Sequence, residues 1–340
     1  MALVLITGGA GFIGSHLVEE LLRRGETVRV LDSLATGSLQ NLRFAVGQVS
    51  LPSDRRQTVY GSQLELIIGD VRDPALVRKA MRGVENVFHL AAITSVAQSI
   101  RQPSEVNSVN VDGTLNVLQA AQSQGVRRVI YASSSAVYGN SDVLPRSEDT
   151  RPTPVSPYGA AKLAGEAYCQ AFWSCYGLET VTLRYFNVYG PRQSATSDYT
   201  SVIPTFILAM LQNQAPVIHG DGKQTRDFVS VDDVVDASIA AAASHLAPGR
   251  CFNVASGEMH SVFDLFESLS EILETNLAPD FSPAQPGDVR ESLGNIELAR
   301  ELLNYIPRTP FHQGLAHTVE FFSHVVAQER GGRIRARAES

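Results

Sequence analysis

The stretch Leu3-Val-Leu-Ile-Thr-Gly-Gly-Ala-Gly-Phe-Ile-Gly14 decides the fold of this chain. Its apolar start predicts a short buried strand, and the glycines after it predict a tight turn that opens a helix over residues 13–22. Glycines in such a turn let the backbone approach a pyrophosphate, and the N-terminus of the helix offers backbone N–H groups to that anion. The stretch therefore predicts a dinucleotide site whose candidate residues are Gly8, Gly11, Phe12, Ile13 and Gly14.

Asp32 ends the second predicted strand, residues 28–32. An acidic residue at this distance from the glycine turn binds the ribose hydroxyls of the adenosine. A carboxylate at this point repels a 2′-phosphate, and no arginine follows Asp32. The sequence therefore favours NAD over NADP as the cofactor.

Strands and helices alternate through the first half of the chain. Further strands are predicted at residues 64–70, 84–90, 126–132 and 181–186, and helices at residues 74–81 and 111–122. This alternation predicts an α/β fold with a doubly wound parallel sheet of the Rossmann kind. Beyond Gly190 the alternation loosens, which predicts a smaller α/β lobe that binds the substrate.

The domain boundaries follow from this change of pattern. We expect residues 1–188 and 227–256 to form the NAD-binding domain, and residues 189–226 and 257–328 to form the smaller lobe. Residues 228–230, a helix over 231–243 and a strand over 251–255 are expected to return to the first domain. The polar segment 43–62 is interpreted as a loop insertion or an added helical turn, and the basic segment 329–340 as a flexible tail.

Composition excludes several classes of protein. The net charge of −7 argues against a nucleic-acid binder, which would be basic. No apolar stretch reaches the roughly 18 residues of a membrane span, and we expect no signal peptide before the first strand. The three cysteines lack the spacing of metal ligands, so no metal is expected. Cys169 and Cys175 are expected to pack inside a helical segment, and a reducing cytoplasm fits them.

Tyr158-Gly-Ala-Ala-Lys162 predicts a pair that transfers protons. Residues four apart lie on one face of a helix, about one turn from each other. Ser156-Pro157 is a favourable helix start, so Tyr158 should lie near the N-terminus, where the helix dipole favours an anion. A phenol has a pKa of about 10, and an adjacent ammonium lowers it. The motif alone also occurs on surface helices, and the dinucleotide turn earlier in the chain is what gives it meaning.

Two more strand ends are expected to border the cofactor. Asp70 and Val71 follow the third strand, where Asp70 either borders the adenine or caps the helix before Pro74. The fourth strand ends in small residues that let the backbone run close to the cofactor, which makes Leu90, Ala91 and Ala92 candidates. His89, in the same strand, is interpreted as a packed histidine and not as a catalyst.

Seven motifs occur in order along the chain, at residues 7–14, 110–114, 133–139, 158–162, 184–192, 220–228 and 287–290. Together they resemble the extended short-chain dehydrogenase/reductase family, in its nucleotide-sugar epimerase and dehydratase branch. The likeness continues to about Leu315. It is greatest to the UDP-hexose 4-epimerases, including those that act on UDP-N-acetylglucosamine and UDP-glucuronate.

The resemblance implies a set of site residues. Ser134 matches the catalytic serine or threonine, Tyr158 the base, and Lys162 the lysine that holds the nicotinamide ribose and lowers the pKa of the phenol. Further cofactor contacts are implied at Asn110 and Tyr185. Substrate contacts are implied at Ser95, Asn187, Arg192, Val202, Arg226, Asp288, Arg290 and Ser292, with Arg226 and Arg290 on the diphosphate.

The implied reaction is C4 epimerisation of a UDP-hexose through a transient 4-keto sugar. Dehydratases carry Asp-Glu where this chain has Ser135-Ala136, and decarboxylases keep a glutamate at Ala136, so both activities are disfavoured. A small residue at Ser292 implies that an N-acetyl group is accepted, while Arg192 leaves UDP-glucuronate open. A homodimer through residues 95–122 and 157–176 is implied as well. The competing interpretations are net oxidoreduction and an NAD-binding protein without catalysis.

Overall fold

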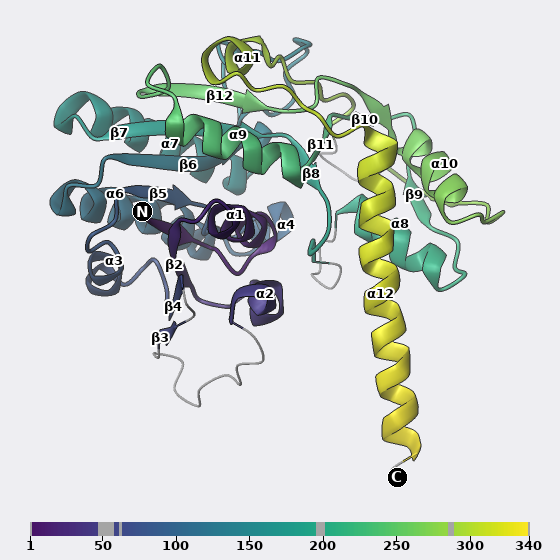
Figure 1. The fold of residues 1–340 in the computed structure, drawn as a ribbon. Coiled ribbons are helices and arrows are strands. Elements are labelled where there is room, and N and C mark those ends of the chain that lie inside the picture. Colours follow the sequence, from purple (N-terminus) through teal and green to yellow (C-terminus); the bar gives the residue numbers. More distant parts are fainter. Residues whose placement is uncertain (1, 47–57, 61–62, 195–200, 285–288, 339–340) are drawn as a thin grey trace.

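A single large sheet organises the computed structural model, which describes residues 2–46, 58–60, 63–194, 201–284 and 289–338. Within these residues its strand order is β12-β7-β6-β5-β1-β2-β4-β3 (Figure 1). All pairs are parallel except that of β3 with β4. The strands are β1 (Leu3–Thr7), β2 (Thr27–Asp32), β3 (Thr58–Tyr60), β4 (Leu64–Ile68), β5 (Asn86–His89), β6 (Arg128–Ser134), β7 (Glu179–Tyr185) and β12 (Arg250–Val254). The predicted doubly wound parallel sheet is confirmed.

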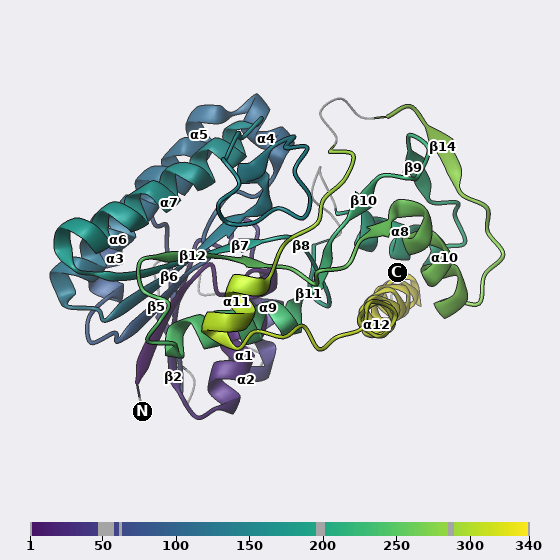
Figure 2. The same cartoon turned by 90° about the horizontal axis from the view of Figure 1, so that it is seen from above.

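Helices cover both faces of this sheet (Figure 2). One layer contains α1 (Phe12–Arg23), α9 (Val231–Ala243) and α11 (Glu297–Leu303). The other contains α3 (Pro74–Ala80), α6 (Gly113–Gln124) and α7 (Pro157–Tyr176), with α4 (Val96–Arg101) and α5 (Pro103–Asn107) beside α7. Cys169 packs in this second layer as expected, whereas Cys175 is exposed, because it lies on the outer side of α7.

The strand order reverses between β1 and β5, and this point places the site. Chain connections leave β1 toward β2 on one side and β5 toward β6 on the other. Ligands of such sheets bind outside the carboxyl ends of the strands, where this reversal opens a crevice. The glycine turn follows β1, and Ser134 ends β6, so both lie at this edge.

A second apolar core lies beside the sheet. It joins α8 (Val202–Leu211), α10 (Val262–Ile272) and α12 (Phe311–Ala338) through residues such as Phe206, Leu265 and Leu315 (Figure 1). Three small strand pairs accompany it: β8 (Asn187–Tyr189) with β11 (Phe228–Ser230), β9 (Val217–His219) with β14 (Asp280–Ser282), and β10 (Thr225–Arg226) with β13 (His260–Ser261). Residues 228–230 thus pair with β8, while β12 joins the main sheet beside β7.

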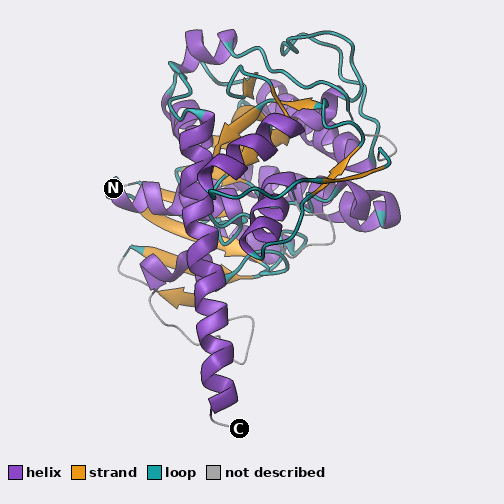
Figure 3. Ribbon diagram, turned by 90° about the vertical axis from the view of Figure 1, so that its right-hand side faces the viewer, coloured by secondary structure: helices purple, strands orange, loops and turns teal. Residues whose placement is uncertain are grey.

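Two peripheral segments differ from the expectation. The predicted helical turn after residue 43 is α2 (Arg43–Val46), preceded by a 3₁₀ turn at Leu39–Leu42, and the short edge strand β3 was not predicted. Residues 47–57 and 61–62 lie outside the described residues. The helix α12 continues to Ala338, through most of the expected tail, because alanine and arginine favour a helix and no proline interrupts it (Figure 3). In the part of the chain that the structure describes, no helix has the length and apolar character needed to cross a bilayer.

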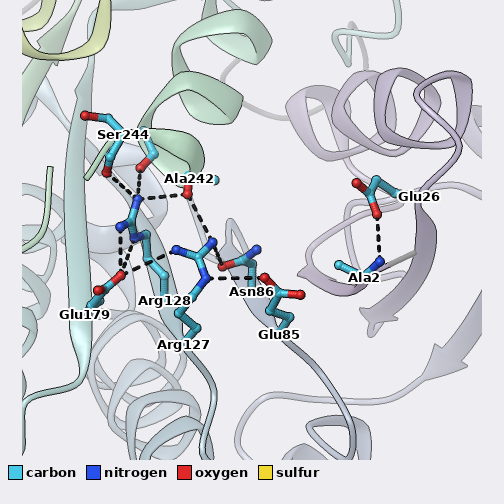
Figure 4. A network of polar contacts seen from close by, with 10 residues as sticks. Ala2, Glu26, Glu85, Asn86, Arg127, Arg128, Glu179, Ala242 and Ser244 are labelled. Atoms are coloured by element: carbon cyan, nitrogen blue, oxygen red, sulfur yellow. Dashed lines mark hydrogen bonds and ion pairs between the residues drawn. The ribbon is translucent and has the colours of Figure 1, made fainter. Parts of the chain in front are cut away.

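A buried arginine organises the amino end of the sheet, opposite the glycine turn. Arg128, at the start of β6, is 2% exposed and forms an ion pair of 2.7 Å with Glu179 (Figure 4). Its Nη1 also donates to the carbonyl oxygens at the end of α9, those of Ala241, Ala242 and Ser244, at 2.6–2.8 Å. These carbonyls would otherwise lack partners at the helix terminus, so Arg128 fastens α9 to the sheet.

Candidate active site

The glycine turn has the geometry that a dinucleotide cradle needs. Gly8 adopts a left-handed φ of +73°, and a Cβ there would lie 2.7 Å from the Ala91 nitrogen. A Cβ on Gly14 would lie 2.2 Å from the Gly8 carbonyl oxygen, so this glycine lets α1 pack against the turn. A Cβ on Gly11 would have that oxygen, at 3.1 Å, as its only neighbour within 4 Å among the described residues. Gly8 and Gly14 therefore permit close packing, and Gly11 keeps the approach to the helix open.

The N-terminus of α1 is suited to an anion. Gly11 is its N-cap residue, no described side chain caps this terminus, and no acidic residue lies in the first turn. The N–H groups of Phe12, Ile13 and Gly14 therefore face outward at the positive end of the helix dipole. This is the arrangement that binds a pyrophosphate.

Asp32 is fixed beside the same turn. Its carboxylate accepts the N–H groups of Ala10 at 2.9 Å and Leu34 at 2.8 Å. Burial raises the pKa of Asp32, and these two hydrogen bonds oppose the rise. The predicted ribose-binding carboxylate thus lies at the carboxyl end of β2 in a single orientation. Sequence reasoning missed Asn41, whose side chain donates to the Ala10 carbonyl at 2.9 Å and closes the next loop over the turn.

Asp70 does not cap the following helix. Asp73 is the N-cap of α3 and accepts the N–H groups of Ala75 and Leu76 at 3.0 Å. Asp70 instead pairs with Arg72, at 2.7 Å, and this hydrogen bond lowers the pKa of the carboxyl. The cap interpretation failed because two aspartates precede Pro74 and only Asp73 has the N-cap spacing. The adenine-side position of Asp70 and Val71 stays a prediction.

His89 connects the glycine turn with the loop after β5. Its Nδ1 lies 2.7 Å from the Thr7 hydroxyl and its Nε2 lies 2.9 Å from the Thr114 hydroxyl. Because Thr114 donates to the Asn110 carbonyl and Thr7 accepts the Ala91 N–H, we assign the proton of His89 to Nε2. Burial lowers the pKa of His89 to about 3, so the ring is neutral at physiological pH. His89 is a packed histidine, as predicted, and it holds two walls of the cradle together.

Asn110 holds the loop after β5 from the other side. Its side chain accepts the Ile93 N–H at 2.8 Å and donates to the Ile93 carbonyl at 2.9 Å. It lies in a π-helical turn, Ser108–Asp112, which directs the amide toward β5. Asn110 therefore fixes the backbone around Leu90, Ala91 and Ala92, the segment predicted to run beside the cofactor.

The three residues predicted to be catalytic come together at the end of β6. Ser156 caps α7 by accepting the Gly159 N–H at 3.1 Å, and Pro157 occupies the first turn, as predicted. The hydroxyl of Ser134 lies beside Tyr158, where it acts to lower the pKa of the phenol. One turn further along α7, Lys162 donates from Nζ to the Ala132 carbonyl at 2.7 Å. The contact of Ser134 with Tyr158 and that of Lys162 with Ala132 therefore both join the carboxyl end of β6 to the start of α7.

The electrostatics differ from the expectation in one respect. Burial raises the pKa of Tyr158, and the hydrogen bond with Ser134 opposes this rise. Burial also lowers the pKa of Lys162 to about 8, and its ammonium faces a backbone carbonyl. The described structure shows no lowering of the phenol pKa by Lys162, whose ammonium donates to the Ala132 carbonyl, and desolvation is the largest influence on that pKa.

Two residues predicted to contact ligands are occupied elsewhere. The hydroxyl of Tyr185 lies 2.9 Å from that of Ser238 on α9, and its contact with the cofactor stays a prediction. Arg192 forms an ion pair with Glu19 of α1 and lies over the Phe44 ring. The contact of Arg192 with the carboxylate of a glucuronate therefore stays a prediction, which would require Arg192 to leave Glu19.

The predicted substrate residues lie mainly on the segments beside the second core. Arg226 donates to the Val289 carbonyl at 2.6 Å, and Arg290 pairs with Asp221 at 2.8 Å while remaining 59% exposed. This ion pair lowers the pKa of Asp221 to about 2. The other predicted positions are an exposed Asn187 at the start of β8, Ser95 as N-cap of α4, Val202 at the start of α8, and a buried Ser292. Asp288 lies outside the described residues.

Sequence reasoning missed the role of Asp227, which lies next to Arg226. This fully buried carboxylate accepts N–H groups from Ser256, Gly257 and Gly294, at 2.7–3.1 Å. It thereby joins β11, the loop after β12 and the segment after Arg290. Only its place in the 220–228 motif marked it in the sequence. Among the described residues, no group of acidic, histidine and cysteine side chains has the arrangement of a metal site.

Comparisons with known proteins agree with this geometry. The family model described as "NAD dependent epimerase/dehydratase family" matches residues 4–255. A UDP-glucose 4-epimerase of Mycolicibacterium smegmatis is 39% identical over 94% of this chain and 97% of its own length.

Two solved structures have the same fold. The UDP-N-acetylglucosamine 4-epimerase of Methanobrevibacter ruminantium, in complex with UDP-N-acetylmuramic acid, superposes with a TM-score of 0.87, at 36% identity over 96% of this chain and 99% of that one. The UDP-glucose 4-epimerase of Thermus thermophilus in complex with NAD has a TM-score of 0.82, at 35% identity over 94% and 98%. The glycine turn, the uncapped helix terminus and Asp32 fit that cofactor. The chain belongs to the NAD-dependent epimerase/dehydratase family, with NAD as its cofactor.

Proposed function

We propose that this protein interconverts the C4 epimers of a UDP-hexose, with Tyr158 as the base. The observation that carries the proposal is the cluster at the end of β6, where Ser134 lies beside Tyr158 and Lys162 is anchored to the Ala132 carbonyl. The cluster lies at the same edge of the sheet as the glycine turn. A sugar hydroxyl between the two would be close to both a proton acceptor and the cofactor.

Each side chain of the site has its own role in the proposed reaction. Tyr158 takes the proton of the C4 hydroxyl and returns it, and Ser134 orients the phenol by its hydrogen bond. NAD, when bound, accepts the hydride from C4 and gives it back. Lys162 supplies positive charge, which favours the phenolate once the ammonium lies near the reacting oxygen. Arg226 and Arg290 hold the diphosphate, since forked guanidinium groups suit phosphate oxygens.

Dehydration and decarboxylation are less well supported. Both need an acid or base directly after Ser134, where this chain has Ser135 and Ala136 in a 3₁₀ turn. A Cβ on Gly159 would lie 2.7 Å from the Ala136 carbonyl oxygen, so this turn packs tightly on the start of α7. Close packing leaves little freedom for a distant carboxylate to take that place.

The sugar class rests on Ser292. This residue is small, 4% exposed, and belongs to the segment that Arg146 holds through the Leu293 carbonyl at 2.9 Å. A small side chain at the pocket wall leaves room for an N-acetyl group, and a similar chain is a UDP-N-acetylglucosamine 4-epimerase. We therefore propose that UDP-N-acetylglucosamine is accepted besides UDP-glucose.

A homodimer is proposed on the surface of α4 and α7. Val96 and Ile100 on α4 are exposed by 43% and 65%, and Tyr168 on α7 by 38%. Pairing with a second copy would remove these apolar side chains from water. We likewise propose that the sheet with its helices binds NAD and that the second core carries the sugar.

One experiment tests the activity and the base together. The wild-type protein and Tyr158→Phe are each incubated with UDP-glucose and with UDP-N-acetylglucosamine, and the epimers are separated by chromatography. We expect both sugars to be converted by the wild type, and conversion to fall at least about 1,000-fold in the variant, while its NAD content stays normal. Near-normal conversion by Tyr158→Phe would refute the base. Conversion of UDP-glucose alone would contradict the proposal that the small Ser292 leaves room for an N-acetyl group.

A further inference from the structure

Glu166 is a buried carboxylate that the reaction described above does not use. It follows Lys162 by four residues and Tyr158 by eight, so all three lie along one face of α7. Its side chain is 10% exposed. A charged side chain so far from water needs partners, and those partners show what it does.

The carboxylate of Glu166 is held by two residues of neighbouring strands. Arg184, on β7, donates from Nη2 to Oε2 at 2.7 Å and from Nε to Oε1 at 3.0 Å. The hydroxyl of Ser133, on β6, donates to Oε1. Ser133 directly precedes Ser134, so Glu166 ties the catalytic helix to the strand end that carries the predicted catalytic serine.

The same network reaches the sugar side of the molecule. Arg184 donates from Nη1 to the Tyr138 hydroxyl at 2.9 Å, and Tyr138 donates to Asn253 Oδ1 at 2.7 Å. The amide of Asn253 then donates to the carbonyls of Arg146 and Asn295, at 2.8 and 3.0 Å. These contacts lead from α7 through β7 and β12 to the segment that carries Ser292. A buried network with this many partners favours one arrangement of the parts it joins.

Lys162 has few sources of compensating charge. On α7 it faces Glu166 and Cys169; on β5 it faces His89; and on β6 its Nζ lies 5.1 Å from the centroid of the Tyr131 ring. Burial raises the pKa of Cys169 to about 12 and keeps His89 neutral, so neither supplies a negative charge.

The charged side chains of the helices across from α7 are exposed: Arg101, Glu105 and Asp112. Among the described groups around Lys162, Glu166 is the carboxylate whose charge favours the ammonium.

We propose that Glu166 is a positioning residue, which keeps Lys162 in its ammonium form and holds the end of β6 in register with the catalytic helix. The proposal rests on the proposed roles of Tyr158 and Lys162. Glu166 does not touch the substrate. Its charge acts through Lys162, and its hydrogen bond acts through Ser133.

The test is the pH dependence of kcat in Glu166→Gln. Because burial lowers the pKa of Lys162 to about 8, the ammonium is lost as the pH rises through that value. Removing the carboxylate lowers this pKa further, so the alkaline limb of the kcat profile should move about one unit toward acid. Glu166→Asp keeps the charge but withdraws it by one methylene, and its limb should lie between those of Glu166→Gln and the wild type.

The matched control is Glu179→Gln. Glu179 pairs with Arg128 at the opposite end of the sheet, at 2.7 Å, so this variant also breaks an arginine–carboxylate pair. The alkaline limb of the kcat profile of Glu179→Gln should coincide with that of the wild type, even if the variant is less stable. An unmoved limb in Glu166→Gln, or an equal movement in Glu179→Gln, overturns the proposal. If Glu166→Gln does not fold, a wild-type limb in Glu166→Asp overturns it. Activity in Tyr158→Phe would instead refute the proposed function itself.

Discussion

Two buried cations, at opposite ends of one sheet, are held in different ways. At the amino end, Arg128 has a carboxylate and three backbone carbonyls as partners. At the carboxyl end, Lys162 is 4% exposed and donates to the Ala132 carbonyl, and burial lowers its pKa to about 8. Breaking a buried ion pair is strongly destabilising, so we expect Arg128 to stabilise the fold. A cation close to losing its proton is suited to chemistry at neutral pH.

The largest effect on stability is expected at the amino end. Arg128→Leu leaves Glu179 without its buried partner and exposes the carbonyls at the end of α9. We expect the free energy of unfolding to fall by about 3 kcal/mol, measured by urea denaturation, with kcat of the folded protein unchanged.

Arg127→Leu is the control for this prediction. Arg127 belongs to the same network, but its side chain is 42% exposed (Figure 4). Its loss should cost no more than about 1 kcal/mol. Equal destabilisation by the two variants would show that burial does not distinguish them.

At the carboxyl end of the sheet, the largest effect is expected on NAD binding, from a substitution in the glycine turn. Gly14→Ala brings a Cβ to 2.2 Å from the Gly8 carbonyl oxygen, which forces the turn away from α1. We expect NAD to bind on the order of 100-fold more weakly, measured by calorimetry on protein stripped of cofactor. In Gly25→Ala, at the other end of α1, the new Cβ meets nothing within 4 Å, and NAD affinity should stay unchanged. A loss of affinity in both variants would point to general strain and not to the cradle.

The smallest effect is expected at an exposed ion pair, where replacing the arginine should change KM and not kcat. Arg290 is paired with Asp221 at the surface, and in the proposed function it exchanges this partner for the diphosphate of the substrate. Arg290→Ala should raise KM for the UDP-sugar about 10-fold and leave kcat nearly constant, since the contact is the same in the ground and transition states. Arg300→Ala, which breaks an exposed pair with Glu297, should change neither constant. A fall in kcat without a change in KM would contradict the role of Arg290.

The local features of the site were predictable because they depend on short spacings. The glycine turn, the N-cap at Ser156 and the pair Tyr158 and Lys162 each follow from contacts within about eight residues. Asp32 was predictable because its distance from the turn is set by one helix and one strand. The packed role of His89 followed from its place inside an apolar strand.

The residues whose partners the sequence did not predict depend on contacts far along the chain. Arg192 pairs with a residue 173 positions earlier, and Tyr185 bonds with Ser238 on a helix from the second half. Asp70 and Asp73 look alike in sequence, and only the hydrogen bonds of α3 separate them. The network around Glu166 joins residues from Ser133 to Asn295, and no spacing rule predicts it.

The sequence by itself determined the parallel sheet, the glycine cradle and the face of α7 that carries Tyr158 and Lys162, because periodicity and capping act over a few residues. Only the tertiary structure decided which charges are paired, which are buried, and that Glu166 of α7 is held by Arg184 and Ser133 of the neighbouring strands. Burial and ion pairing depend on residues brought together from across the chain, and desolvation then sets the charge of groups such as Lys162.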